Sequence, residues 1–170
     1  MDTVVSRENI DTWGADSDKL LWFRRALEEM QAISDAALMD ERGYQWVAGV
    51  HGGFGGEPFC EHGTPHFLTW HRPYLLDIET KLRVQIDKLF AEEAAEAWRL
   101  PYWDWAAQDV AGLPRAFTDE SYVHEGQTKP NPLFSMPFDL TTGEWPAGTP
   151  TFRRVRPLSS LRPLRQLVVD

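Results

Sequence analysis

The chain has 170 residues, a formal net charge of −9 at pH 7, 42% hydrophobic residues and 25% charged residues. This length suits one domain, and this composition is that of a globular protein, which excludes disorder, collagen and coiled coil. No apolar run approaches the roughly 18 residues that a membrane span needs, so no membrane partner is expected. The N-terminal residues contain acids and no apolar signal core, so a cytoplasmic location is expected.

Charge is unevenly distributed along the chain. Residues 151–170 carry five arginines and one acid, whereas residues 1–150 carry 12 basic and 25 acidic groups. We therefore expect one folded unit over residues 1–150 and a basic, arginine- and proline-containing segment over residues 151–170. The acidic body argues against a nucleic-acid partner, because phosphate contacts need lysine and arginine.

The stretch from Ser17 to Ala37 predicts a helix, with Ser17 as the N-cap. Charged residues, among them Arg24 and Glu28, are expected mainly on the other face. The apolar residues at helical spacing are Leu20, Leu21, Phe23, Leu27, Met30 and Ile33.

A short apolar stretch, Tyr44–Val50, comes next, and His51 then opens the glycine-rich run HGGFGGEP, which predicts a loop. A second helix is predicted from about Pro65 or Leu68 to about Trp98. Its apolar stripe consists of Leu75, Ile78, Leu82, Ile86, Leu89 and Phe90.

His71 lies four residues before Leu75, so its side chain is expected to point inward with that stripe. After Leu100 the chain is rich in proline, and no segment alternates convincingly as a strand. The predicted fold class is mainly α, with long irregular proline-rich loops.

The histidines are the strongest chemical signal. The chain has five, and four of them, together with Cys60, fall within 21 residues; the five are His51, His62, His66, His71 and His124. Imidazole is the commonest protein metal ligand, so this cluster predicts metal binding.

Position along the chain ranks these histidines as candidate ligands. His51 at the end of the apolar stretch, His62 on a loop and His71 on a helix can converge on one ion. His66 lies five residues before His71, about 140° further round a helix, so it is expected off that face. His124 is isolated in a predicted loop and is expected to be solvated.

Spacing alone does not separate copper from zinc. Cys60, His62, His66 and His71 together make a four-ligand zinc site conceivable, although structural zinc sites usually have tighter paired spacing. A further alternative is a tryptophan-rich protein-interaction module in which the histidines are incidental.

The sequence on either side of the histidines distinguishes these alternatives. The segment CEHG at 60–63, followed by FLTWHRPYLL at 67–76 and Glu79, resembles the first copper-site signature of the tyrosinase family of type 3 copper proteins. This family includes polyphenol oxidases, catechol oxidases and molluscan hemocyanin domains. The segments LPYWDW at 100–105 and NPL at 131–133 also resemble the family, and the resemblance covers about residues 6–135.

The resemblance implies half of a four-helix-bundle type 3 copper domain, in which His51, His62 and His71 ligate one copper ion. It also implies a Cys60–His62 thioether, found in some family members, and packing of Phe67 beside the copper. Three charged residues near these motifs are interpreted as paired scaffold ions: Arg72, Glu79 and Asp104.

The function that the resemblance implies is that of an oxidoreductase, a monooxygenase or polyphenol oxidase, which uses O2 to oxidise phenols and catechols to quinones. The family's second copper needs three more histidines, which this chain lacks. We therefore expect the second half from another chain or from a homodimer. The alternative is a non-catalytic mononuclear copper-binding or oxygen-carrier-like remnant, or a zinc-binding module.

Overall fold

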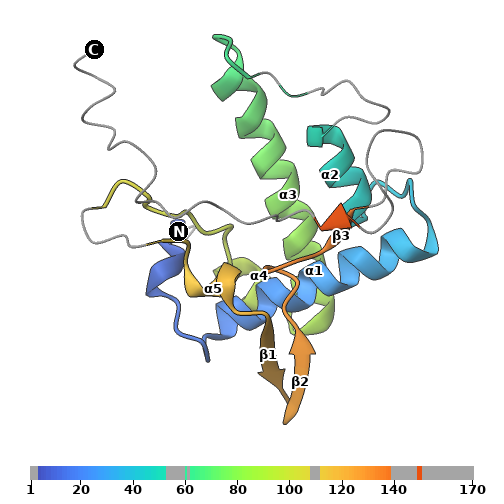
Figure 1. Cartoon of the computed structure of the whole chain (residues 1–170), viewed down its shortest axis with the longest axis vertical. Coiled ribbons are helices and arrows are strands. Elements are labelled where there is room, and N and C mark those ends of the chain that lie inside the picture. Colours follow the sequence, from blue (N-terminus) through green and yellow to red (C-terminus); the bar gives the residue numbers. More distant parts are fainter. Residues whose placement is uncertain (1–3, 53–59, 61, 108–111, 139–148, 151–170) are drawn as a thin grey trace.

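A computed structural model describes residues 4–52, 60, 62–107, 112–138 and 149–150 (Figure 1). The predicted fold class, mainly α, is confirmed. The elements are a 3-10 helix Ile10–Thr12, α1 Asp18–Ala36, α2 Tyr44–Gly52, α3 Phe67–Leu89, α4 Glu92–Ala97, α5 Arg115–Thr118, β1 Ser121–His124, β2 Gln127–Pro130, β3 Pro137–Phe138 and β4 Thr149–Pro150. The expected basic segment, 151–170, lies outside the described residues.

Helix α1 follows the sequence pattern closely. Ser17 occupies the N-cap position, and Leu20, Phe23 and Met30 are buried. Arg24, expected on the outer face, is instead 4% exposed. Its Nε donates to Asn131 Oδ1 at 3.2 Å, so a partner distant in sequence accounts for the difference.

Helix α3 crosses α1, and the core lies where these two helices and α4 meet (Figure 1). Leu82 and Ile86 are fully buried there, but Leu75 and Phe90 of the predicted stripe are each 36% exposed. The C-terminal half of α3 packs on α1, whereas Leu75 lies in the other half and Phe90 follows the end of the helix. Among the described residues, no helix has the length and apolar character needed to cross a membrane.

The second predicted helix is interrupted. Helix α3 ends at Leu89, and α4 begins at Glu92 after an extended Ala91 with φ of 172°. The interruption lets Trp98 become fully buried, with its indole N–H donating to the carbonyl of Lys19 at 3.1 Å. Burial of one large side chain against α1 thus outweighs the helical propensity of the intervening residues.

Two short antiparallel strand pairs form where no segment alternates convincingly as a strand. Strands β1 and β2 pair antiparallel, with Ser121 opposite Pro130 and His124 opposite Gln127, and β3 pairs with β4. The turn between β1 and β2 uses Glu125 and Gly126, both at positive φ. His124, expected in a solvated loop, is therefore a half-buried strand residue.

The segment LPYWDW lies beside the N-terminal part of the chain. Tyr102 N–H donates to the carbonyl of Glu8, and Ile10 N–H donates to the carbonyl of Tyr102. This parallel bridge attaches residues 100–105 to the same core as α1.

Candidate metal centre

Helix α2 carries the first candidate ligand, His51. The stretch Tyr44–Val50 is helical, and the helix continues through Gly52, so His51 lies within a helix and does not open a loop as predicted. Most of the glycine-rich run, 53–59, lies outside the described residues.

The start of α2 is attached to α1. Ser34 Oγ donates to the carbonyl of Met30 and accepts from the N–H of Gln45 at 3.0 Å. Gly43 packs on this hydroxyl so closely that a Cβ atom there would lie 2.4 Å from Ser34 Oγ. Only glycine fits at this joint between the two helices.

The middle of α2 is attached to α3. Tyr74 of α3 donates its hydroxyl hydrogen to the carbonyl of Val47 at 2.9 Å. The two helices therefore lie side by side, as Figure 1 shows. This arrangement brings His51 of α2 beside His71 of α3.

Three histidine rings gather at this junction. The ring centroids of His51 and His62 are 5.4 Å apart, those of His51 and His71 5.5 Å, and those of His62 and His71 5.1 Å. The Nε2 atoms of His51 and His71 are separated by 3.4 Å. The three side chains that the resemblance implied as ligands thus lie together.

Local contacts orient the His71 and His51 rings. His71 Nδ1 donates to the carbonyl of Phe67, one helical turn earlier, at 2.7 Å. In the neutral imidazole this leaves Nε2 unprotonated and free to bind a metal. Burial lowers the pKa of His51 below its usual value, and the neighbouring His71 and His62 lower it further, which favours the neutral, metal-binding form.

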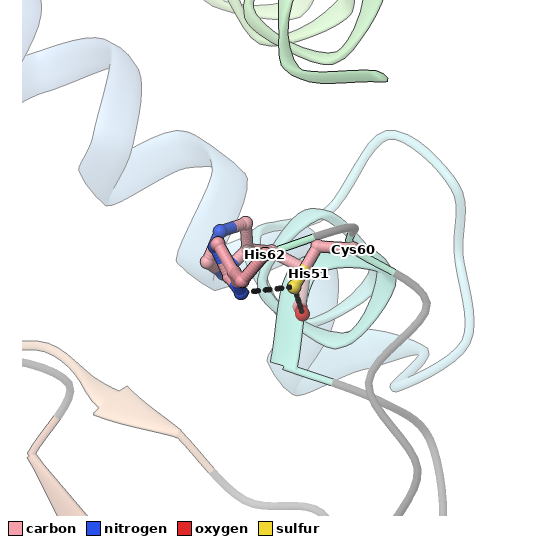
Figure 2. A group of neighbouring side chains, drawn as sticks. All are labelled: His51, Cys60 and His62. Atoms are coloured by element: carbon pink, nitrogen blue, oxygen red, sulfur yellow. Dashed lines mark hydrogen bonds between the residues drawn. The ribbon is translucent and has the colours of Figure 1, made fainter. Parts of the chain in front are cut away.

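The sulfur atom of Cys60 points toward His51 and His62, as Figure 2 shows. Its thiol is buried and donates to the carbonyl of His51 at 2.9 Å, and its Sγ lies 3.4 Å from His62 Nδ1. One ligand atom from each of His51, Cys60 and His62 lies within 4.8 Å of the others. The sulfur thus lies beside the ring that the thioether expectation named, which stays a prediction.

Phe67 and His66 differ in their relation to this group. Phe67 is 42% exposed, and its ring centroid is 4.4 Å from that of His71 and 5.9 Å from that of His62. The ring of Phe67 therefore packs against both imidazole rings. His66 is exposed at the N-cap of α3, and within the described residues no ring contact joins it to the other histidines.

The three predicted scaffold ions behave differently from one another. Glu79 is 6% exposed, pairs with Arg7 at 2.9 Å and accepts from the N–H of Leu100 at 3.0 Å. It thereby joins the α3 motif to LPYWDW. Arg72 and Asp104 are exposed, and no ion pair joins either of them to another described residue, so their pairing stays a prediction.

Two aromatic residues were missed by sequence reasoning. Tyr74 stacks on His51 with a centroid distance of 5.5 Å and an interplanar angle of 26°. The ring centroids of Trp70 and His71 are 4.8 Å apart. The spacing of Tyr74 from His71, three residues on one helix, was a usable signal, since residues three or four apart share a face. Trp70 directly precedes His71, so spacing gave no such signal for it.

The donor set fits a transition-metal ion. Two imidazole nitrogens bound at about 2.0–2.1 Å in tetrahedral geometry are about 3.3 Å apart, and the separation between His51 and His71 Nε2 is 3.4 Å. Imidazole suits copper, zinc and iron alike, so geometry alone does not select the metal.

Comparison with known proteins selects among these metals. The family model "Common central domain of tyrosinase" matches residues 41–163. The chain belongs to the tyrosinase family. Membership in this family implies copper as the metal, and nothing supports the zinc alternative.

Relatives of this tyrosinase-family chain include fungal and molluscan proteins. It is 32% identical over 162 residues to a tyrosinase of Podospora anserina, covering 71% of this chain and 27% of that protein. It is 33% identical over 155 residues to a tyrosinase of Aspergillus oryzae, covering 81% of this chain and 24% of that protein. It is 33% identical over 126 residues to a hemocyanin of Enteroctopus dofleini, covering 68% of this chain and 4% of that protein.

Solved tyrosinase structures share the fold. An oxygen-bound pro-tyrosinase of Aspergillus oryzae with a cysteine-to-alanine change matches with a TM-score of 0.65 and 29% identity, over 79% of this chain and 30% of that one. A copper-bound active form matches with a TM-score of 0.64 and 27% identity, over 81% and 40%. The chain spans about a quarter of the length of the tyrosinases of Podospora anserina and Aspergillus oryzae.

Proposed function

We propose that this chain is the first-copper half of a tyrosinase-type oxidoreductase, which oxidises phenols or catechols with O2 when the second half is present. His51, His62 and His71 would hold the copper ion. The single observation that carries this proposal is the convergence of their three rings, from two helices and a loop, within 5.5 Å of one another.

The choice of His71 over Cys60 as third ligand rests on their contacts. Cys60 is turned toward the backbone carbonyl of His51 and toward His62 Nδ1. His71, in contrast, has its Nδ1 committed to the Phe67 carbonyl, and its Nε2 lies near the Nε2 of His51. The sulfur is therefore better suited to restrain His62 than to bind the metal.

Bound copper would supply the electron transfer that links phenol oxidation to reduction of O2. The residues of this chain contribute binding and orientation. The half-exposed ring of Phe67, 4.4 Å from that of His71, offers an apolar face on which a phenol ring can pack. The carbonyl of Phe67 meanwhile holds the His71 ring in one tautomer.

Completion of a dinuclear site needs histidines from outside these 170 residues. The chain has five histidines, and two sites of three need one more than that. The N-terminal half of α3 also leaves apolar side chains uncovered, with Leu68 66%, Leu76 59% and Leu75 36% exposed. This apolar face beside the histidines suits a complementary half, either a second polypeptide or a second copy of this chain.

Copper titration of the purified chain tests the ligand set. The wild type should bind one copper per chain, and His71→Ala should weaken binding strongly, whereas the matched variants His66→Ala and His124→Ala should bind as the wild type. Equal affinity of wild type and His71→Ala would contradict the assignment.

Native mass spectrometry of the copper-loaded chain, followed by a catechol oxidation assay, tests the complete activity. An active dimer with two copper ions would support self-complementation. An inactive monomer with one copper ion would favour a separate second half or the non-catalytic alternative, a mononuclear copper-binding or oxygen-carrier-like module. Activity restored by adding a polypeptide with the missing histidines would exclude that alternative.

A further inference from the structure

Tyr74 contacts the helix that carries His51 through its hydroxyl group. The hydroxyl donates to the carbonyl of Val47 at 2.9 Å. Val47 precedes His51 by four residues, so this is the carbonyl that faces the His51 N–H in an α-helix. The bond therefore fixes the turn of α2 from which the His51 side chain departs.

The ring of Tyr74 contacts the imidazole itself. The two rings are stacked, with centroids 5.5 Å apart and an interplanar angle of 26°. Trp70 supports the tyrosine from the same helix, with its centroid 5.1 Å from that of Tyr74 and 6.1 Å from that of His51. One side chain thus touches both the backbone turn and the ring of the same histidine.

The three histidines are restrained in different ways. His71 is held by the carbonyl of Phe67, and the ring of His62 lies against the sulfur of Cys60. For His51, the contacts of Tyr74 supply both a position for the backbone and a plane for the ring. Groups that orient metal ligands typically change metal affinity about 10–100-fold when they are removed.

We propose that Tyr74 is a positioning residue for His51, which sets the location and the ring plane of this ligand without itself touching the metal. The inference rests on the copper site proposed above. It assigns Tyr74 a role beyond packing, because loss of its ring should alter the metal's ligand field as well as the stability of the chain.

Two variants separate the contacts of Tyr74. Tyr74→Phe keeps the stacked ring and loses only the bond to Val47, whereas Tyr74→Leu loses both. Phe23→Leu is the matched control, because Phe23 is also an aromatic residue packed on another ring, that of Trp98 at 5.4 Å, and belongs to the core.

The experiment measures the Cu(II) dissociation constant by chelator competition and records the Cu(II) electron paramagnetic resonance spectrum of the 170-residue chain and of each variant. We expect Tyr74→Leu to raise the dissociation constant more than about tenfold and to shift the spectrum. Tyr74→Phe should raise it about threefold to tenfold, the effect of one lost hydrogen bond. Phe23→Leu should lower the unfolding temperature and leave affinity and spectrum unchanged.

The outcomes separate this inference from the proposed function. Copper binding by the wild type, with the same affinity and spectrum in Tyr74→Leu, would overturn the positioning role alone. If Tyr74→Leu does not fold, Tyr74→Phe decides, and wild-type affinity in that variant would overturn the role. Failure of the wild type to bind copper would overturn both the site and the inference.

Discussion

His51 and His71 are twenty residues apart and belong to different helices, yet their Nε2 atoms are 3.4 Å apart. The two helices contact each other. Their two nitrogen atoms therefore form a preorganised pair of electron donors for a metal ion. A metal bound between them links α2 to α3, so occupancy of the site and stability of the fold depend on each other.

Removal of copper should therefore lower the unfolding temperature. A ligand that binds only the folded state at a free concentration 100 times its dissociation constant adds about 2.7 kcal/mol. Differential scanning calorimetry of copper-loaded and chelator-treated chains checks this. His66→Ala should retain the copper-dependent increase, and His51→Ala should lose it; an identical increase in both variants would argue against His51 as a ligand.

Cys60 offers a chemical test of the thioether expectation. Because its sulfur lies 3.4 Å from the His62 ring, exposure of the copper-loaded chain to O2 should join the two, with O2 taking up the two electrons and two protons released. Intact mass spectrometry should then detect loss of two hydrogen atoms, together with loss of the titratable thiol. Cys60→Ala should show neither change, and an unaltered wild-type mass with a fully reactive thiol would contradict the prediction.

Glu79→Gln should destabilise the chain by about 1–3 kcal/mol, because it removes the charge from a buried acceptor of two groups, Arg7 and the Leu100 N–H. Asp77→Asn, on the same helix, is the matched control. It weakens the ion pair that the exposed Asp77 forms with Lys81, which should cost about 0.5 kcal/mol or less. Urea unfolding measures both, and equal effects would show that burial of Glu79 contributes nothing.

Gly43→Ala should destabilise the chain by about 1–3 kcal/mol, because its Cβ would overlap Ser34 Oγ. Adding Ser34→Ala removes the overlapping atom, so the double variant should lose less than the sum of the single changes. Gly14→Ala is the control, since nothing lies within 4 Å of a Cβ there. Thermal unfolding of the four variants checks the non-additivity, and strict additivity would contradict the overlap.

Asn131→Ala should destabilise the chain by about 2–4 kcal/mol, since it leaves buried groups unpaired. Asn131 is 1% exposed, accepts from Arg24 and donates to the carbonyls of Ala116 and Asp119. Asn9→Ala is a milder comparison, because within the described residues the exposed hydrogen bond of the Asn9 side chain is the one from the Asp11 N–H. Asn9→Ala should lower the free energy of unfolding by about 1 kcal/mol. An equal decrease in both variants would show that the buried hydrogen bonds of Asn131 add no particular stability.

Sequence patterns predicted the features that depend on neighbours in the chain. The N-cap position of Ser17 follows from its residue type, and the burial of Leu20, Phe23 and Met30 follows from helical periodicity. The gathering of the histidine rings was implied by the resemblance of their surroundings to a known family.

Features that depend on distant partners were not predictable in this way. The burial of Arg24 requires Asn131, and the interruption after Leu89 requires the burial of Trp98 against α1. The helical setting of His51 requires attachments through Ser34 and Tyr74. In each case a contact between remote segments overrides the local preference of the chain.

The hydrogen bond between Arg24 and Asn131 joins two residues that the ribosome adds at different times. It joins residues 107 positions apart. At a synthesis rate of about 5–20 residues per second, Arg24 is made about 5–20 s before its partner. During that interval α1 carries a cation on its inner face without the amide that accepts from it. The nascent chain therefore acquires its final packing around α1 only after the segment beyond the first hairpin has emerged from the ribosome.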